Sequence, residues 1–297
     1  MPAPLRGTQT LVGQMNWVWN RPLLVLMEVG WRWLFGIPLL LIGWFEVQRI
    51  LLILPPWSTG LASINWDNPW QLVAQLSTAW TLYEPHLLAM ATWLAPIAAL
   101  VWILLSGVGR WALLRRMEPT IASRPGALVL LQAVWMIALA STMGAWFYGL
   151  NSISAAHISA TGEPDLVGYL IGVIVLSLST FVVWALVSWV VSIAPLLVVL
   201  EDISPGRALF RALRLGKSFT SKLVEINLVM GIVRLALIVL ATVFSAAPLP
   251  FGDQLGPESL RVVLALSMIF YLLASDYFEV VRLKSFIEFW KMYRKAG

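Results

Sequence analysis

The chain has 297 residues, of which 60% are hydrophobic and 12% are charged, and its mean hydropathy is +0.82. Soluble domains are about 45–50% apolar and about 25% charged, so this composition excludes an ordinary soluble protein. The chain has no cysteine and two histidines, which excludes disulfides and Cys-based metal sites and leaves little room for zinc, haem or Ser-His chemistry. We expect no cofactor. The net charge of +5 is typical of the Lys and Arg excess on the cytoplasmic side of membrane proteins, and we expect no nucleic-acid partner.

Six apolar runs have the length, about 20 residues, that crosses the hydrocarbon core of a bilayer. We predict an all-α fold, an integral membrane bundle of six transmembrane helices that forms a single polytopic domain over residues 1–297. The predicted spans are approximately 34–54, 87–107, 127–149, 167–199, 223–246 and 259–280. The stretch before Arg21 lacks the apolar core of a secretory signal, so we expect the first span to be retained.

Charge predicts the orientation of these spans. Most Lys and Arg residues lie in the two tails and in the second and fourth connections, whereas the other connections carry mainly acids. By the positive-inside rule, the N-terminus and the C-terminus are both cytoplasmic in a bacterial inner membrane.

Three further stretches, approximately 68–84, 205–217 and 281–295, predict interfacial amphipathic helices. The second begins with Ser204 as N-cap and Pro205 at its first position, and places Leu209, Ala212 and Leu213 on one side. The third sets Phe286, Ile287, Trp290 and Tyr293 against basic residues. Side chains expected at anionic lipid headgroups are Arg207, Arg211, Arg214, Lys217, Lys284 and Lys291. Docking of a membrane-protein partner is the alternative role for these helices.

The stretch "APLLVVLEDISPGRALFRALRLGKSF" (194–219) resembles the E-x-x-S-P-x-x-A-L-x-x-S-x-x-L segment of bacterial polytopic membrane proteins of unassigned function. This group includes the membrane domain found beside some glycerophosphodiester phosphodiesterases. The chain departs from the pattern at Ala212, where Ser is frequent. The resemblance implies a six-span fold with a cytoplasmic amphipathic helix before the fifth span. It does not imply phosphodiesterase activity, which belongs to a separate barrel domain.

Charged residues at membrane depth are expensive and are natural candidates for function. Glu46 and Arg234 fall at similar depth in the predicted first and fifth spans, and we expect them to form an intramembrane ion pair. The pair either fixes helix register or forms part of a site for a polar headgroup or a proton-coupled solute. Glu225, Asp276 and Glu279 lie near the inner leaflet, where Lys and Arg are abundant.

Three functions follow as hypotheses. The favoured one is a non-enzymatic scaffold or accessory subunit of a membrane complex or envelope process, because no catalytic motif is present. The second is a lipid or small-solute transporter that uses Glu46 and Arg234. The third is an intramembrane enzyme, which would need the 151–165 loop to meet His86 or His157.

The predicted orientation can be tested with single-cysteine variants, since the chain has no native cysteine. Glu163→Cys should react with an impermeant thiol reagent from the outside and Arg214→Cys only from the inside. The reverse labelling pattern would contradict the topology.

Overall fold

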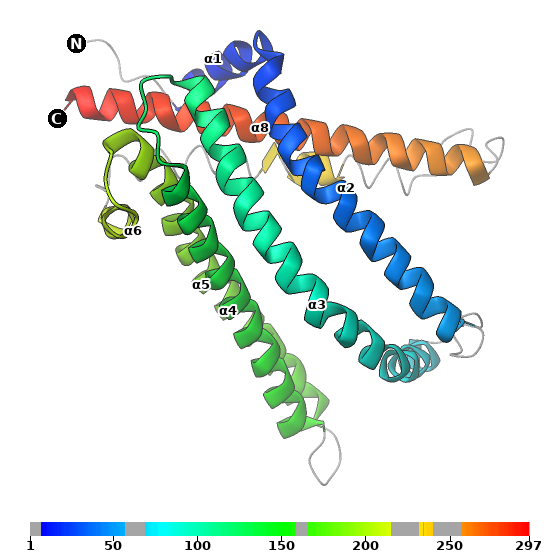
Figure 1. Ribbon diagram of the computed structural model, residues 1–297. Coiled ribbons are helices and arrows are strands. Elements are labelled where there is room, and N and C mark those ends of the chain that lie inside the picture. The colour runs from blue at the N-terminus through cyan, green and yellow to red at the C-terminus, as the bar shows by residue number, and fades with distance from the viewer. Residues whose placement is uncertain are drawn as a thin grey trace. The chain divides into compact units, whose positions relative to one another are not determined.

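A computed structural model describes residues 7–56, 69–158, 165–214, 232–233, 235–239 and 257–296, and these residues form helices and their connections, without strands (Figure 1). The helices are α1 (Gly7–Trp19), α2 (Pro22–Ile53), α3 (Pro69–Met117), α4 (Pro125–His157), α5 (Leu166–Glu201), α6 (Pro205–Leu213) and α8 (Pro257–Ala296).

Within the described ranges, four helices are long and apolar enough to cross a membrane: α2, α3 from Thr78 onward, α4 and α5. They correspond to the first four predicted spans, so the prediction of long apolar helices compatible with a membrane protein is confirmed there. The fifth predicted span, 223–246, lies mostly outside the described residues. The sixth, 259–280, lies within α8, which is not among the four. The total of six spans stays a prediction.

Several helices extend beyond the predicted bounds, and α8 joins the predicted span 259–280 and the predicted interfacial helix 281–295 in one helix. The first predicted span is part of a longer helix, α2, which already begins at Pro22. Proline is common in the first turn of a helix. In α3, the predicted interfacial helix 68–84 and the span 87–107 are one helix, which continues through Pro85 and Pro96. Figure 1 shows that the cyan start of α3 and its later teal part run in different directions. Proline inside a helix removes one hydrogen bond and kinks the helix without necessarily ending it.

The chain divides into two compact units, one of residues 31–106 and one that combines residues 1–30 with 107–297. In the first unit, α2 and α3 run in opposite directions (Figure 1). The ring of Trp102 lies 5.5 Å from that of Trp31 and 5.0 Å from that of Phe35. The Tyr83 hydroxyl donates to the carbonyl of Leu54 at 2.8 Å. Aromatic contacts and one hydrogen bond therefore join these two helices.

In the second unit, α4 and α5 pack closely as a hairpin. The Trp146 indole donates to Ser177 Oγ at 3.1 Å. Gly172 permits the approach, because a methyl group added there would lie 3.0 Å from Ile153 Cγ2. Gly107, near the end of α3, is more constrained still, since an added methyl would come within 2.7 Å of the Cα of Val129 in α4. Small residues thus bring helix backbones together, as is common in membrane proteins.

The core of the second unit surrounds the C-terminal half of α8. Residues of this stretch are buried on every side of the helix, and with their neighbours from α1, α6 and the adjoining ends of α2–α5 we call them the α8 platform. Its buried α8 side chains are Asp276, Glu279, Val280, Val281, Leu283, Lys284, Ser285, Phe286, Ile287, Phe289 and Trp290. A helix enclosed all round is a core helix rather than a one-sided amphipathic helix. The predicted interfacial position of 281–295 is therefore not confirmed.

Helix α6 turns its smallest side chains toward the protein. Ala208 and Ala212, one turn apart, are buried, whereas Phe210 and Leu213 are exposed. The prediction placed Leu213 on the same side as Ala212, and the structure separates them because only the alanine side fits closely against the platform. Pro205 occupies the first turn as predicted, and Ser204 precedes it in an extended conformation without a side-chain capping bond.

The central place of α8 can be tested with Ile287→Ala. Ile287 is 1% exposed, so the variant should lose about 2–5 kcal/mol of unfolding free energy through lost burial and the cavity left behind. Leu178→Ala, at an exposed position of α5, is the matched control and should lose much less. Chemical unfolding in detergent micelles measures both, and equal losses would contradict the enclosed position of α8.

Candidate functional site

The buried charges of the second unit gather where α3 meets α8. Glu279 is 2% exposed and its Oε1 accepts from Arg110 Nη1 at 3.2 Å and from Arg282 Nη2 at 2.5 Å. Arg110 also interacts electrostatically with Glu28, which is fully buried at the start of α2. Removing one partner of such a group leaves an uncompensated buried charge, which costs about 3–5 kcal/mol. These groups therefore hold the platform together.

Helix α1 closes one side of the platform through aromatic side chains. The Tyr277 hydroxyl donates to the carbonyl of Met15 at 2.9 Å, and its ring meets that of Trp19 edge to face at 6.1 Å. The ring of Trp17 has two cations against it, with Arg21 Cζ 3.9 Å and Lys284 Nζ 4.6 Å from its centroid. Cation–π contacts of this kind gain strength where the cation is desolvated, and Lys284 is 5% exposed.

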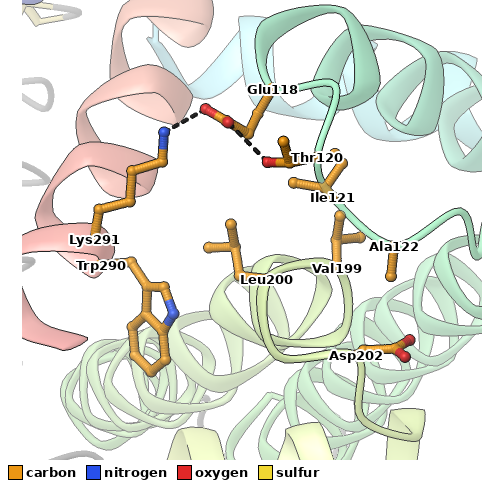
Figure 2. Close-up of a pocket in the computed structure, with 9 residues that line it drawn as sticks. All are labelled: Glu118, Thr120, Ile121, Ala122, Val199, Leu200, Asp202, Trp290 and Lys291. Atoms are coloured by element: carbon orange, nitrogen blue, oxygen red, sulfur yellow. Dashed lines mark hydrogen bonds and ion pairs between the residues drawn. The ribbon is translucent and has the colours of Figure 1, made fainter. Parts of the chain in front are cut away.

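A pocket with a volume of about 410 Å³ opens between the connection that follows α3, the end of α5 and the last part of α8 (Figure 2). Its lining residues are Glu118, Thr120, Ile121, Ala122, Val199, Leu200, Asp202, Trp290 and Lys291. The amide of Ala122 donates to the carbonyl of Val199 at 3.2 Å, which ties two of the walls together. The volume lies within the range of about 300–1,000 Å³ that is usual for small-molecule sites.

Two ion pairs flank this pocket. On one side, the ammonium of Lys291 donates to Glu118 Oε2, and Thr120 Oγ1 donates to Glu118 Oε1 at 2.9 Å (Figure 2). On the other side, Arg124 Nε lies 2.6 Å from Asp202 Oδ1. Asp202 ends α5 with a left-handed backbone, φ 55°, a conformation that Asp and Asn adopt more readily than most residues.

The pair at the Lys291 side shifts the pKa of both of its members. The hydrogen bond from Lys291 lowers the pKa of Glu118, and the bond to Glu118 raises the pKa of Lys291. Both shifts favour the charged form of the group. The pocket therefore presents two carboxylates and an ammonium group.

The predicted inner-leaflet acids are in part brought together. Asp276 and Glu279 both lie buried in the platform, and Glu279 meets Arg110 and Arg282. Glu225 lies outside the described residues. The sequence alone does not predict that Glu28 takes part in this cluster. Arg110, with which it interacts, is far from it in sequence, and the residues around Glu28 belong to the tail that precedes the first predicted span.

The predicted pair of Glu46 and Arg234 stays a prediction, since Arg234 lies outside the described residues. Glu46 Oε2 lies 3.7 Å from Arg49 Nη1 in the same helix. The Arg49 side chain is 74% exposed and that of Glu46 is 24% exposed.

The predicted headgroup residues occupy different surroundings. Arg207, Arg211 and Arg214 lie on the exposed side of α6, with Arg211 Nε 2.9 Å from Glu201 Oε2 and Arg214 Cζ 4.1 Å above the Phe210 ring. Lys284 is buried and bonds Glu288 at 2.5 Å, while Lys291 is 40% exposed beside the pocket. Lys217 lies outside the described residues. Their role at lipid headgroups stays a prediction.

At the opposite end of the α4–α5 hairpin, Asp165 joins the two helices. Its Oδ2 lies 3.1 Å from His157 Nδ1, and its Oδ1 accepts from the amide of Gly168 at 2.9 Å. The backbone bond from Gly168, and then His157, lowers the pKa of Asp165. Among the described residues, no group of three or more His, Cys, Asp or Glu residues is placed to hold a metal ion. The geometry is that of a helix N-cap with a side-chain brace.

No protein-family model, curated protein or solved structure matches this chain.

The pair of Glu118 and Lys291 predicts a specific pH dependence. Because the folded state lowers the Glu118 pKa below its ordinary value of 4.5, the stabilisation is present above that value and is lost as pH falls through the lowered pKa. Glu118→Gln should therefore reduce the unfolding free energy by about 1 kcal/mol at neutral pH, since Lys291 is partly exposed, and by progressively less below pH 4.5.

Thr120→Val is the control for this measurement, because it removes one hydrogen bond to Glu118 and keeps the ion pair. Unfolding by denaturant at a series of pH values measures all three proteins. A pH-independent difference between the wild-type protein and Glu118→Gln would contradict the assignment.

Proposed function

We propose that the protein is a non-enzymatic multi-pass protein of a bacterial inner membrane, with six spans and both termini in the cytoplasm, that serves as a scaffold or accessory subunit of a membrane complex. The observation that carries this proposal is a difference in burial within the second unit. The apolar windows of α4 and α5 are 11% and 0% buried within the chain, whereas the C-terminal half of α8 is enclosed by its neighbours. The spans thus offer apolar surface to lipid and to partner helices.

The charged groups of the platform support a holding role rather than a catalytic one. Glu279 is bonded to Arg110, Glu118 to Lys291 and Asp202 to Arg124. Each of these pairs joins residues from two different parts of the chain, and none places a nucleophile beside a base. These ion pairs hold the ends of the helices in place, and a rigid docking surface in a membrane requires helices that are held in this way.

The exposed side of α6 supports contact with anionic lipid. Ala208 and Ala212 fill the side toward the protein, so Phe210, Leu213 and Arg207 lie on the outer side. An apolar strip bordered by arginines suits the interface between acyl chains and anionic headgroups. We propose that α6 rests on the inner leaflet and orients the platform there.

Native mass spectrometry of the protein extracted together with its surrounding lipid tests the scaffold role. We expect stoichiometric partner chains, bound in part through the apolar face of α5, which is the most hydrophobic of the four spans. Combined Ile171→Ala, Val175→Ala, Leu178→Ala and Val182→Ala substitutions, all at exposed positions, should lower partner occupancy at least about tenfold, the equivalent of 1.4 kcal/mol.

Leu40→Ala with Trp44→Ala on α2, also at exposed positions, provides the matched control for loss of apolar area. A protein that carries lipid alone in every preparation would contradict the scaffold proposal. Equal loss of the partner from both variants would place the contact elsewhere than on α5 and contradict that part of the proposal.

A further inference from the structure

The pocket of Figure 2 lies where three membrane-length helices end. Glu118 directly follows the last residue of α3, Asp202 directly follows the last residue of α5, and Arg124 directly precedes α4. The ends of membrane-length helices mark the level at which acyl chains give way to polar headgroups. A ligand that reaches this pocket from the membrane would therefore present its polar end there.

The charges at the pocket restrict the class of ligand. The lining carries the carboxylates of Glu118 and Asp202 and the ammonium of Lys291, and Arg124 adds a second cation through its bond to Asp202. An anion would meet two carboxylates, and a simple cation would compete with the two basic side chains. A ligand with one positive and one negative group leaves the balance of charges unchanged and can satisfy both signs.

We propose that this pocket binds a phosphoethanolamine-type group, in which a primary ammonium is joined through two carbons to a phosphate. The ammonium donates hydrogen bonds to Asp202 on one side of the pocket, and the phosphate accepts from Lys291 on the other side. The two carbons lie against Ile121, Val199 and Leu200, whose side chains form the apolar lining between the ion pairs. The position at the helix ends favours the membrane form of this group, the headgroup of phosphatidylethanolamine.

A primary ammonium fits this lining better than a quaternary one. Carboxylates accept hydrogen bonds, and a primary ammonium supplies three N–H donors, whereas a trimethylammonium supplies none. Quaternary ammonium groups are instead held by exposed aromatic faces. The one aromatic side chain of the pocket lining, Trp290, is 5% exposed and so offers little ring surface.

This inference rests on the membrane placement proposed above and is independent of the scaffold role. The experiment is native mass spectrometry of the purified full chain in micelles supplemented with equal amounts of phosphatidylethanolamine, phosphatidylcholine and phosphatidylglycerol of identical acyl chains. We expect one retained phosphatidylethanolamine, preferred at least about tenfold over the other two, since one charge-assisted hydrogen bond is sufficient for that ratio. Equal retention of the three lipids would overturn the proposal, whether or not partner chains are found.

Two variants assign the binding to the pocket. Asp202→Asn keeps a residue that tolerates the left-handed backbone and removes the charge, so it should weaken retention about tenfold. Ala122→Phe fills the pocket without changing any charge and should abolish retention. Asp165→Asn, at the far end of the hairpin, is the matched control and should retain the lipid normally. Should Asp202→Asn lose its helical circular dichroism signal, Ala122→Phe decides, and retention by a folded Ala122→Phe protein would overturn the proposal.

Soluble phosphoethanolamine distinguishes the two sources of this chemistry. Displacement of the retained lipid by millimolar phosphoethanolamine, but not by phosphate or ethanolamine alone, would support recognition of the joined group. Tighter binding of the soluble compound than of a short-chain phosphatidylethanolamine would overturn the membrane source while keeping the recognised group.

Discussion

The second unit depends on the pairing of its buried carboxylates, and the contacts of Glu279 show how. Glu279 lies inside the core between two guanidinium groups, one from its own helix and one from the end of α3. A charge in such a place is tolerated only when it is paired, so the ion pair with Arg110 ties the 107–117 end of α3 to α8. Leu113, Leu114 and Ile287 then pack around a geometry that the charges have already restricted.

The short connection after α3 also joins neighbouring helices. It is bonded to α8 through Glu118, to the end of α5 through the amide of Ala122, and again to α5 through Arg124. Three helices therefore end at defined places around one pocket. Helix ends held in this way restrict the movement of the helices against one another, which suits the partner and lipid binding proposed above.

The spans of α2 to α5 were predictable because a run of about twenty apolar residues has few other solutions. The enclosed position of α8 was not. Phe286, Ile287 and Trp290 lie on one side of α8. Apolar residues at this spacing are typical of an amphipathic helix at a surface, so the pattern does not predict a helix buried all round. The buried position of α8 depends in part on its ion pairs with Arg110 and Glu118. These residues lie 169 and 173 positions from their partners Glu279 and Lys291. Pairing over such separations leaves no local pattern in the sequence. At Glu46 the pair that the structure describes is the local one with Arg49, and the predicted pair with Arg234 stays a prediction.

The order of these elements along the chain has a consequence for biogenesis. The hydroxyl of Tyr277 bonds a carbonyl 262 positions earlier, and the helices around α8 are all synthesised before it. While the ribosome is still translating, α1, the end of α3 and α6 therefore expose the apolar and charged surfaces that α8 later covers. Contacts over such separations form slowly. During that interval Arg110 lacks the carboxylate of Glu279, and the nascent protein is open to chaperones and proteases that the finished one no longer attracts.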